Sequence, residues 1–165
     1  MKWYWKLMVL IAVGTLVFCI AGMVYVVKAK YQMNEYVLQL GAAFNAATIV
    51  NAEETHLEED KAVIAEYEGR RAVISPDNYK ALQSYLRRHY ATPPFARVKK
   101  DEALHIVFCG HTHLYAVPDK DGQGALLLLE TGEKDYTMHI ASTDLWQRIL
   151  DISMDGRAQY PNIPL

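Results

Sequence analysis

The stretch from Leu104 to Ala141 decides the fold of this chain: LHIVFCGHTHLYAVPDKDGQGALLLLETGEKDYTMHIA. Its short apolar and alternating segments predict four β-strands, at Leu104 to Phe108, His113 to Val117, Ala125 to Glu130 and Asp135 to Ala141. Residues typical of hairpin turns separate the later strands, at 119–124 and 131–134. An antiparallel meander follows from this order. Leucines 126–129 are apolar on both faces, which predicts a central strand lying under helices.

Helices are predicted on both sides of the meander. One begins at Ser142 or Thr143 and contains Leu145, Trp146, Ile149 and Leu150. Another begins at Ser75-Pro76 and presents the apolar face Tyr79, Leu82, Tyr85 and Leu86. The capping-box spacing of Thr55 and Glu58 predicts a third helix that reaches Glu68. Gly69 is expected to end this helix, and a short strand is expected at 72–74. The inward residues of the helix would be Leu57, Ile64 and Tyr67. Residues 55–155 are thus expected to form an α+β domain of helices packed on an antiparallel sheet, followed by an irregular tail at 156–165.

An amphipathic helix is expected before this domain, over residues 28–54. Apolar residues recur there at steps of three and four: Met33, Val37, Leu40, Phe44 and Ala47. No proline interrupts the pattern. We interpret the segment as a stalk and Met33, Val37, Leu40 and Phe44 as candidate contacts for a partner.

Residues 7–27, LMVLIAVGTLVFCIAGMVYVV, contain no charged side chain over 21 positions. A helix of this length spans about 31 Å, close to the ~30 Å hydrocarbon core of a bilayer. Trp3, Trp5, Tyr25 and Tyr31 stand near its two ends, where aromatic rings favour the membrane interface. The run therefore predicts a single transmembrane helix after a short tail at 1–6.

A cleaved signal peptide is the alternative for this run. Its apolar region normally has about 7–15 residues and a small-residue cleavage site, whereas Val26, Val27 and Lys28 follow here. Lys2, Lys6 and the α-amine lie on one side, Lys28 and Lys30 on the other, which favours an inside N-terminus and an extracytoplasmic domain. Cys19 lies in the membrane run and Cys109 in the domain, so this pair implies no internal disulfide.

The charge of the rest of the chain limits the classes of partner that we expect it to bind. Residues 31–165 hold 13 of the 17 Lys and Arg residues and all 19 Asp and Glu residues, a net charge of −6. This balance argues against nucleic-acid binding. Acidic residues gather at 53–68 and basic residues at 70–100. They either pair within the domain or make it a dipole that docks on copies of itself or on partners.

The segment Phe108-Cys-Gly-His-Thr-His113 suggests a possible chemistry for the domain. Its Gly-His-Thr-His part resembles the last metal-binding motif of calcineurin-like metallophosphoesterases. The resemblance implies that His111 and His113 lie beside metal ions in a hydrolytic site. The other motifs of that family, Asp-x-His, Gly-Asp-x-x-Asp and Gly-Asn-His, do not occur in this sequence, so the bridging carboxylates of a two-metal site are missing.

A simpler metal site is also consistent with the same residues. If the strand continues through Gly110, then His105, Cys109, His111 and His113 point to one side, and a His-x-His pair is able to bridge zinc or copper. His139 would join only from a neighbouring strand. Alternatively, the histidines belong to a solvated sheet face, or Gly110 forms a bulge or turn that breaks the alternation.

The expected function is that of a single-pass, membrane-anchored protein. Its α+β domain is expected to mediate protein–protein interaction as a subunit of a membrane or envelope complex, with no cofactor and no catalytic residue. Its expected partners are the lipid bilayer and other membrane or envelope proteins, copies of itself included. The alternative is a membrane-tethered domain that binds zinc or another transition metal, or a metal-dependent hydrolase, using the Gly-His-Thr-His segment.

Overall fold

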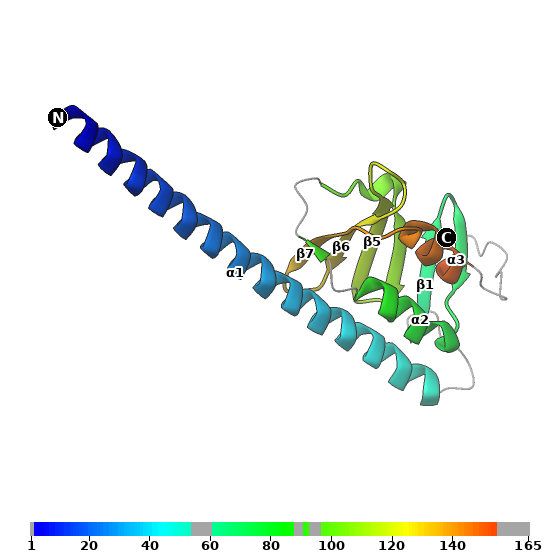
Figure 1. The fold of residues 1–165 in the computed structure, drawn as a ribbon. Helices are drawn as coiled ribbons and strands as arrows, with labels where there is room; N and C mark the ends of the chain where they lie inside the picture. The colour runs from blue at the N-terminus through cyan, green and yellow to red at the C-terminus, as the bar shows by residue number, and fades with distance from the viewer. Residues whose placement is uncertain (1, 54–60, 88–90, 93–96, 155–165) are drawn as a thin grey trace. The chain divides into compact units, whose positions relative to one another are not determined.

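The computed structural model of the chain describes residues 2–53, 61–87, 91–92 and 97–154 (Figure 1). The chain divides into two units, which we call unit 1 (Met1–Gln32) and unit 2 (Met33–Leu165). Helix α1 (Lys2–Glu53) contributes residues to both units. Each unit is described here by itself.

Unit 2 is an α+β fold, as the sequence predicts. After α1, its described elements are β1 (Val63–Tyr67), β2 (Arg70–Val73), α2 (Pro76–Leu86), β3 (Ala91–Thr92), the short 3₁₀ helix η2 (Lys100–Glu102), β4 (Leu104–Phe108), β5 (Thr112–Pro118), β6 (Ala125–Glu130), β7 (Asp135–Ile140) and α3 (Leu145–Met154). Among the described residues the strands form one sheet in the order β2-β1-β4-β5-β6-β7-β3. Every neighbouring pair is antiparallel.

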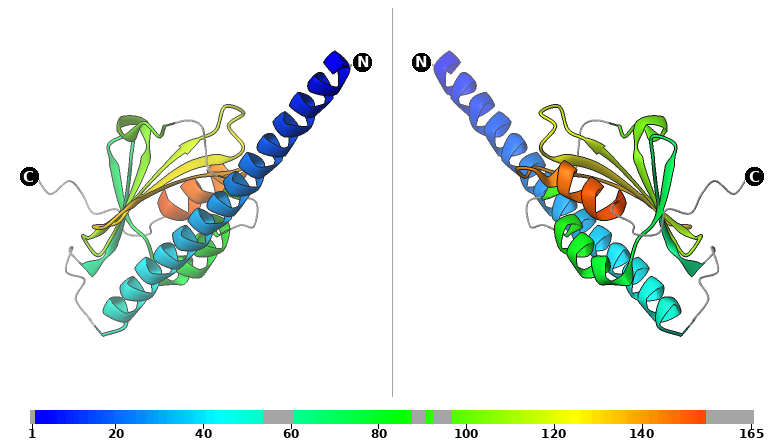
Figure 2. Two further views of the ribbon diagram at one scale, coloured as in Figure 1. Left: turned by 90° about the vertical axis from the view of Figure 1, so that its left-hand side faces the viewer. Right: turned by 90° about the vertical axis from the view of Figure 1, so that its right-hand side faces the viewer.

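The sheet has two different faces. On the inner face, alternate residues of β4 to β7 are buried in the core, among them Leu104, Ile106, Phe108, Leu114, Leu127, Leu129 and Met138. The part of α1 in unit 2, together with α2 and α3, lies on this face (Figure 2). On the opposite face, here called the outer face, most side chains are half-buried, including His105, Val107, His113, Tyr115, Leu126 and Leu128.

The predicted meander of β4 to β7 is confirmed, and its strand limits agree within a residue or so. One detail differs, because helices cover only one face of β6. Leu127 and Leu129 are buried beneath them, whereas Leu126 and Leu128 alternate onto the outer face and are half-buried. The four-leucine run therefore indicates a strand in the middle of the sheet, of which only one face is covered by helices.

The helix predicted from Thr55 to Glu68 is wrong in its second half, because Val63–Tyr67 forms strand β1. The first half lies outside the described residues. Glu68 and Gly69 both have positive φ, 49° and 73°, and form the tight turn of a β1–β2 hairpin. Gly69 is therefore a turn residue and not a helix stop. Pairing with β4 on its other side places β1 inside the sheet, and this long-range ladder overrides the local helical pattern.

The apolar stripe of residues 33–47 is helical as predicted, but it is not the surface of a free-standing stalk. Tyr36, Leu40 and Phe44 are buried in the core of unit 2. The Phe44 ring packs edge-to-face on Phe108 of β4, with ring centroids 4.9 Å apart, and on Tyr79 of α2 at 6.0 Å. From Met33 onward α1 is thus the central helix of the domain.

The two remaining helices agree with their sequence signals. Pro76 stands in the first turn of α2, and Tyr79, Leu82 and Leu86 are buried. Ser75 precedes it at the N-cap position, without a side-chain capping hydrogen bond. In α3, Leu145, Trp146 and Ile149 are buried. The predicted irregular tail at 156–165 lies outside the described residues.

Unit 1 consists of the first part of α1. Within the described residues, this is the one helix long and apolar enough to cross a membrane, judged by length and composition. Its most apolar 18-residue window has a mean hydropathy of 2.7, and none of that window is buried. Large apolar side chains such as Leu10, Phe18 and Val24 are exposed. A membrane anchor and a signal sequence near the N-terminus both meet this criterion.

Candidate functional site

The candidate site is built on the β4–β5 hairpin, whose turn sets the position of each predicted residue. Cys109 and Gly110 have positive φ, 48° and 73°, and the His111 amide donates to the Phe108 carbonyl at 3.1 Å. The chain therefore reverses at Gly110 instead of continuing as one strand. The alternation expected across Gly110 is broken, as the turn alternative predicted.

The turn separates the four predicted metal ligands into different environments. Cys109 packs against the core, and its thiol donates to the Lys61 carbonyl at 3.3 Å. His111 is exposed in the turn. His105 on β4 and His113 on β5 both lie on the outer face. In the part of the chain that the structure describes, no three His, Cys, Asp or Glu residues are close enough together to hold a metal ion.

His105 and His113 are brought into direct contact by the hairpin register. Val107 lies opposite His113, and His105 lies opposite Tyr115, so the two histidines are diagonal neighbours on one face. The Nε2 atom of His105 is 3.0 Å from Nδ1 of His113. This contact is a hydrogen bond between the two rings, which lie end to end along it with centroids 5.3 Å apart and planes 20° from parallel. The His105 ring also stacks on the Tyr115 ring, at a centroid distance of 4.5 Å.

Charged residues surround this histidine pair. A Glu66 carboxylate oxygen lies 3.7 Å from Nδ1 of His105, and its other oxygen is 3.1 Å from Nε of Arg71. Lys100 lies 4.9 Å from the centre of the Tyr115 ring and pairs with Glu130. Burial lowers the pKa of His105 and the neighbouring His113 lowers it further, whereas Glu66 acts in the opposite direction. The net result is a pKa of His105 below its ordinary value.

The sequence did not point to Glu66 or Tyr115 as members of this cluster. The sequence pattern predicts a helix at Glu66, and only the β1–β4 register places this residue opposite His105. Tyr115 follows His113 by two residues, so strand alternation alone was enough to put both on one face. His139 does not join the cluster, since its Nε2 atom contacts Asp119 Oδ2 at 3.4 Å.

The candidate contact residues on α1 are covered by the chain itself. Leu40 and Phe44 are buried, and Met33 and Val37 are partly buried against the same core. Leu40 and Phe44 therefore contribute their apolar surface to the core of unit 2, and a partner contact at Met33 and Val37 stays a prediction. In contrast, Trp3, Trp5, Tyr25 and Tyr31 are exposed, and their position at a membrane interface stays a prediction.

The acidic and basic segments meet at least once within the domain. The Glu66–Arg71 pair joins β1 to β2, which is the intramolecular pairing that the charge pattern allowed.

No protein-family model matches this chain, and no curated protein or solved structure matches it either.

Proposed function

We propose that this chain is a single-pass membrane protein whose α+β domain binds other membrane or envelope proteins as a subunit of a complex. The observation that carries the proposal is the exposure of the apolar part of α1. None of the most apolar window is buried, and Leu10 and Phe18 are 71% and 80% exposed. Exposed apolar surface costs about 25 cal/mol per Å² in water, so a helix that is apolar on all sides is stable only in lipid or against another protein.

The connection between anchor and domain is short. Only residues 28–32 separate the apolar run from Met33, the first residue of unit 2. Even a fully extended connection of this length reaches only about 20 Å. We therefore expect the partners of the domain to be proteins of the same membrane.

A contact surface for such a protein lies on the outer face, at β5 and β6. Tyr115, Val117, Leu126 and Leu128 are half-buried there, and we call them the β5–β6 patch. Cross-strand pairing holds them together, with Tyr115 opposite Leu128 and Val117 opposite Leu126. The Lys100–Glu130 pair stands beside the patch. Apolar and aromatic side chains next to charged ones are typical of protein interfaces.

The test is the size of the particle that the full chain forms after extraction from its membrane in mild detergent. Light scattering of the wild-type chain is expected to give a protein mass above that of one copy. Leu128→Glu, which places a charge in the patch, is expected to reduce it to one copy. The matched control is Leu38→Glu, because Leu38 is 71% exposed on α1 and lies outside the patch.

Two results would contradict the proposal. One is a single-copy mass for the wild-type chain, and the other is an assembly that both glutamate variants preserve. Circular dichroism of the variants separates loss of assembly from loss of folding. Mass spectrometry of the wild-type particle then identifies whether the partner is a second copy or another membrane protein.

The same proposal places the N-terminus inside and the domain on the extracytoplasmic side. Its support is the excess of positive charge before the apolar run, formed by Lys2, Lys6 and the α-amine against Lys28 and Lys30.

A further inference from the structure

We propose that the hydrogen bond between His105 and His113 is an acid-sensitive latch that controls docking of a partner on the β5–β6 patch. The latch is closed near neutral pH and opens when both imidazoles carry an added proton. This inference rests on the proposed function, since the patch is the surface that the latch regulates. The contact between the two rings and the position of Tyr115 beside them carry it.

The geometry of the histidine pair limits the number of protons that it holds. Nε2 of His105 and Nδ1 of His113 are 3.0 Å apart, so one ring donates a proton to this contact and the other accepts it. One added proton leaves the hydrogen bond in place, because a protonated imidazole still donates to a neutral one. A second added proton puts an N–H on both facing atoms, and no acceptor remains. The closed latch therefore holds at most one positive charge.

Charged side chains from the neighbouring elements face the histidine pair. Among the described residues these are Glu66 of β1, Arg71 of β2, Glu130 of β6 and Lys100 of η2. Glu66 lies 3.7 Å from Nδ1 of His105, and Glu130 lies opposite His113 in the β5–β6 register. Each of these carboxylates also pairs with a base, Arg71 or Lys100, which leaves less negative charge to compensate the histidines.

The pH range of the latch follows from these surroundings. Burial lowers the pKa of His105 below its ordinary value of 6.5 and His113 lowers it further, while Glu66 and Glu130 oppose this only in part. The opened form takes up protons near pH 6.5 and the closed form only at lower pH, so the balance moves toward the opened form as the pH falls below 6.5. We expect a closed latch at about pH 7.5 and an open latch at about pH 5.

Tyr115 connects the latch to the β5–β6 patch. Its ring stacks on the His105 ring with centroids 4.5 Å apart and planes 2° from parallel, and Tyr115 is itself a member of the patch. Nζ of Lys100 lies 4.9 Å from the centre of the same ring, so one positive charge already adjoins the patch. Two protonated histidines add to this charge, and a partner that covers the patch has to remove all of it from water, which is costly. Opening the latch therefore weakens docking.

The experiment is light scattering of the full chain in mild detergent at about pH 7.5 and about pH 5. Wild type is expected to be assembled at the higher pH and to fall to the mass of one copy at the lower pH. His113→Gln is expected to stay assembled at both, because the glutamine carbonyl accepts a hydrogen bond from His105 in either charge state. His111→Gln is the matched control, since His111 is exposed in the same hairpin, and it is expected to respond to pH as wild type does.

A second measurement follows the latch itself, independently of assembly. Nuclear magnetic resonance of the ¹⁵N-labelled wild-type chain in detergent is expected to show a coupling across the hydrogen bond between Nε2 of His105 and Nδ1 of His113 at about pH 7.5. The coupling is expected to be lost at about pH 5. Circular dichroism at both pH values checks that wild type and the two variants stay folded.

Several outcomes overturn the latch alone. They are a wild type assembled at both pH values, a His113→Gln variant that dissociates at about pH 5 as wild type does, and a coupling that persists at about pH 5. Unfolding of wild type at about pH 5 also overturns it, because the whole domain and not the histidine pair would then respond to acid. A wild type that has the mass of one copy at about pH 7.5 contradicts the proposed function, and the latch with it.

Discussion

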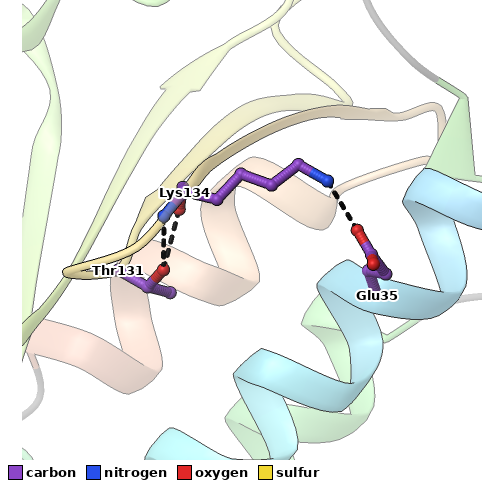
Figure 3. Close-up of polar contacts among 3 residues, drawn as sticks. All are labelled: Glu35, Thr131 and Lys134. Carbon is purple, nitrogen blue, oxygen red and sulfur yellow. Dashed lines mark hydrogen bonds and ion pairs between the residues drawn. The ribbon is translucent and has the colours of Figure 1, made fainter.

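Lys134, in the turn between β6 and β7, extends to α1 and donates a 2.6 Å hydrogen bond to the Glu35 carboxylate (Figure 3). The turn is itself closed by Thr131, whose hydroxyl accepts from the Lys134 amide at 3.1 Å and donates to its carbonyl at 2.8 Å. The pair links residues 99 positions apart in the sequence. It joins the end of the meander to the segment of α1 that the sequence alone suggested was a separate stalk.

Despite this position, the ion pair is expected to contribute little stability. Lys134 is 48% exposed and Glu35 is 26% exposed, so solvent screens the attraction. A double-mutant cycle with Lys134→Ala and Glu35→Ala is expected to give a coupling of about 0.2–1 kcal/mol by urea unfolding, smaller still in 1 M salt. A coupling above about 2 kcal/mol would mean that the pair is much less hydrated than it is here.

Leu40→Ala is expected to destabilise unit 2 by about 2–5 kcal/mol, because it empties a fully buried position between α1 and the sheet. Leu38→Ala on the same helix is the control and should stay within about 0.5 kcal/mol, since Leu38 is exposed. The measurement is urea unfolding followed by near-ultraviolet circular dichroism. If both variants had equally small effects, this part of α1 would instead be a free-standing stalk.

Gly124→Ala is expected to destabilise the β5–β6 hairpin by about 1–3 kcal/mol. A Cβ at Gly124 would lie 2.5 Å from the Ile140 carbonyl oxygen, a backbone atom that has little room to move, and would also press on the Asp119 side chain. Gly132→Ala in the next turn meets no atom within 4 Å and should change stability by less than about 0.5 kcal/mol. Thermal melting of the two variants checks this, and similar melting temperatures would contradict it.

Because Tyr36 is buried, we expect unit 2 to lose stability in alkaline solution. Burial raises its pKa above the ordinary value of 10, and its hydroxyl donates to the Leu86 carbonyl at 3.3 Å. Above about pH 10 the unfolded chain releases this tyrosine proton while the folded chain keeps it, so the free energy of unfolding falls as the pH rises. Tyr36→Phe should cost about 1 kcal/mol at pH 8 through the lost hydrogen bond and show a weaker decline from pH 9 to 11. Parallel pH profiles of the two proteins, measured by urea unfolding, would refute this assignment.

The proposed topology predicts that a thiol at Glu133→Cys reacts with a membrane-impermeant maleimide in intact cells. Glu133 is exposed in the β6–β7 turn of unit 2. The wild-type chain is the control, because Cys109 is only half-exposed and Cys19 lies in the apolar run. Labelling that requires permeabilised cells would place the domain on the inner side.

Much of the fold follows from local sequence. Period-two alternation and turn residues located β4 to β7, because each strand of a meander pairs with its neighbour in sequence and needs only a short turn. Ser75-Pro76 marked the start of α2 for the same local reason. The candidate metal residues could be named from sequence, since histidines clustered around one strand end are visible in the printed chain.

What the sequence by itself determined, then, is an apolar N-terminal helix, the four-strand meander and helices before and after it, because these depend on neighbouring residues. The tertiary structure decided the rest. Val63–Tyr67 is a strand because it pairs with β4, some 40 residues away. The apolar stripe of α1 belongs to the core because it packs on the inner face of the sheet. His105 and His113 meet because the chain turns at Gly110, which selected this pair and excluded Cys109 and His111. Contacts between distant segments decided the first two of these points, whereas the contact between the two histidines depends on the hairpin turn between them.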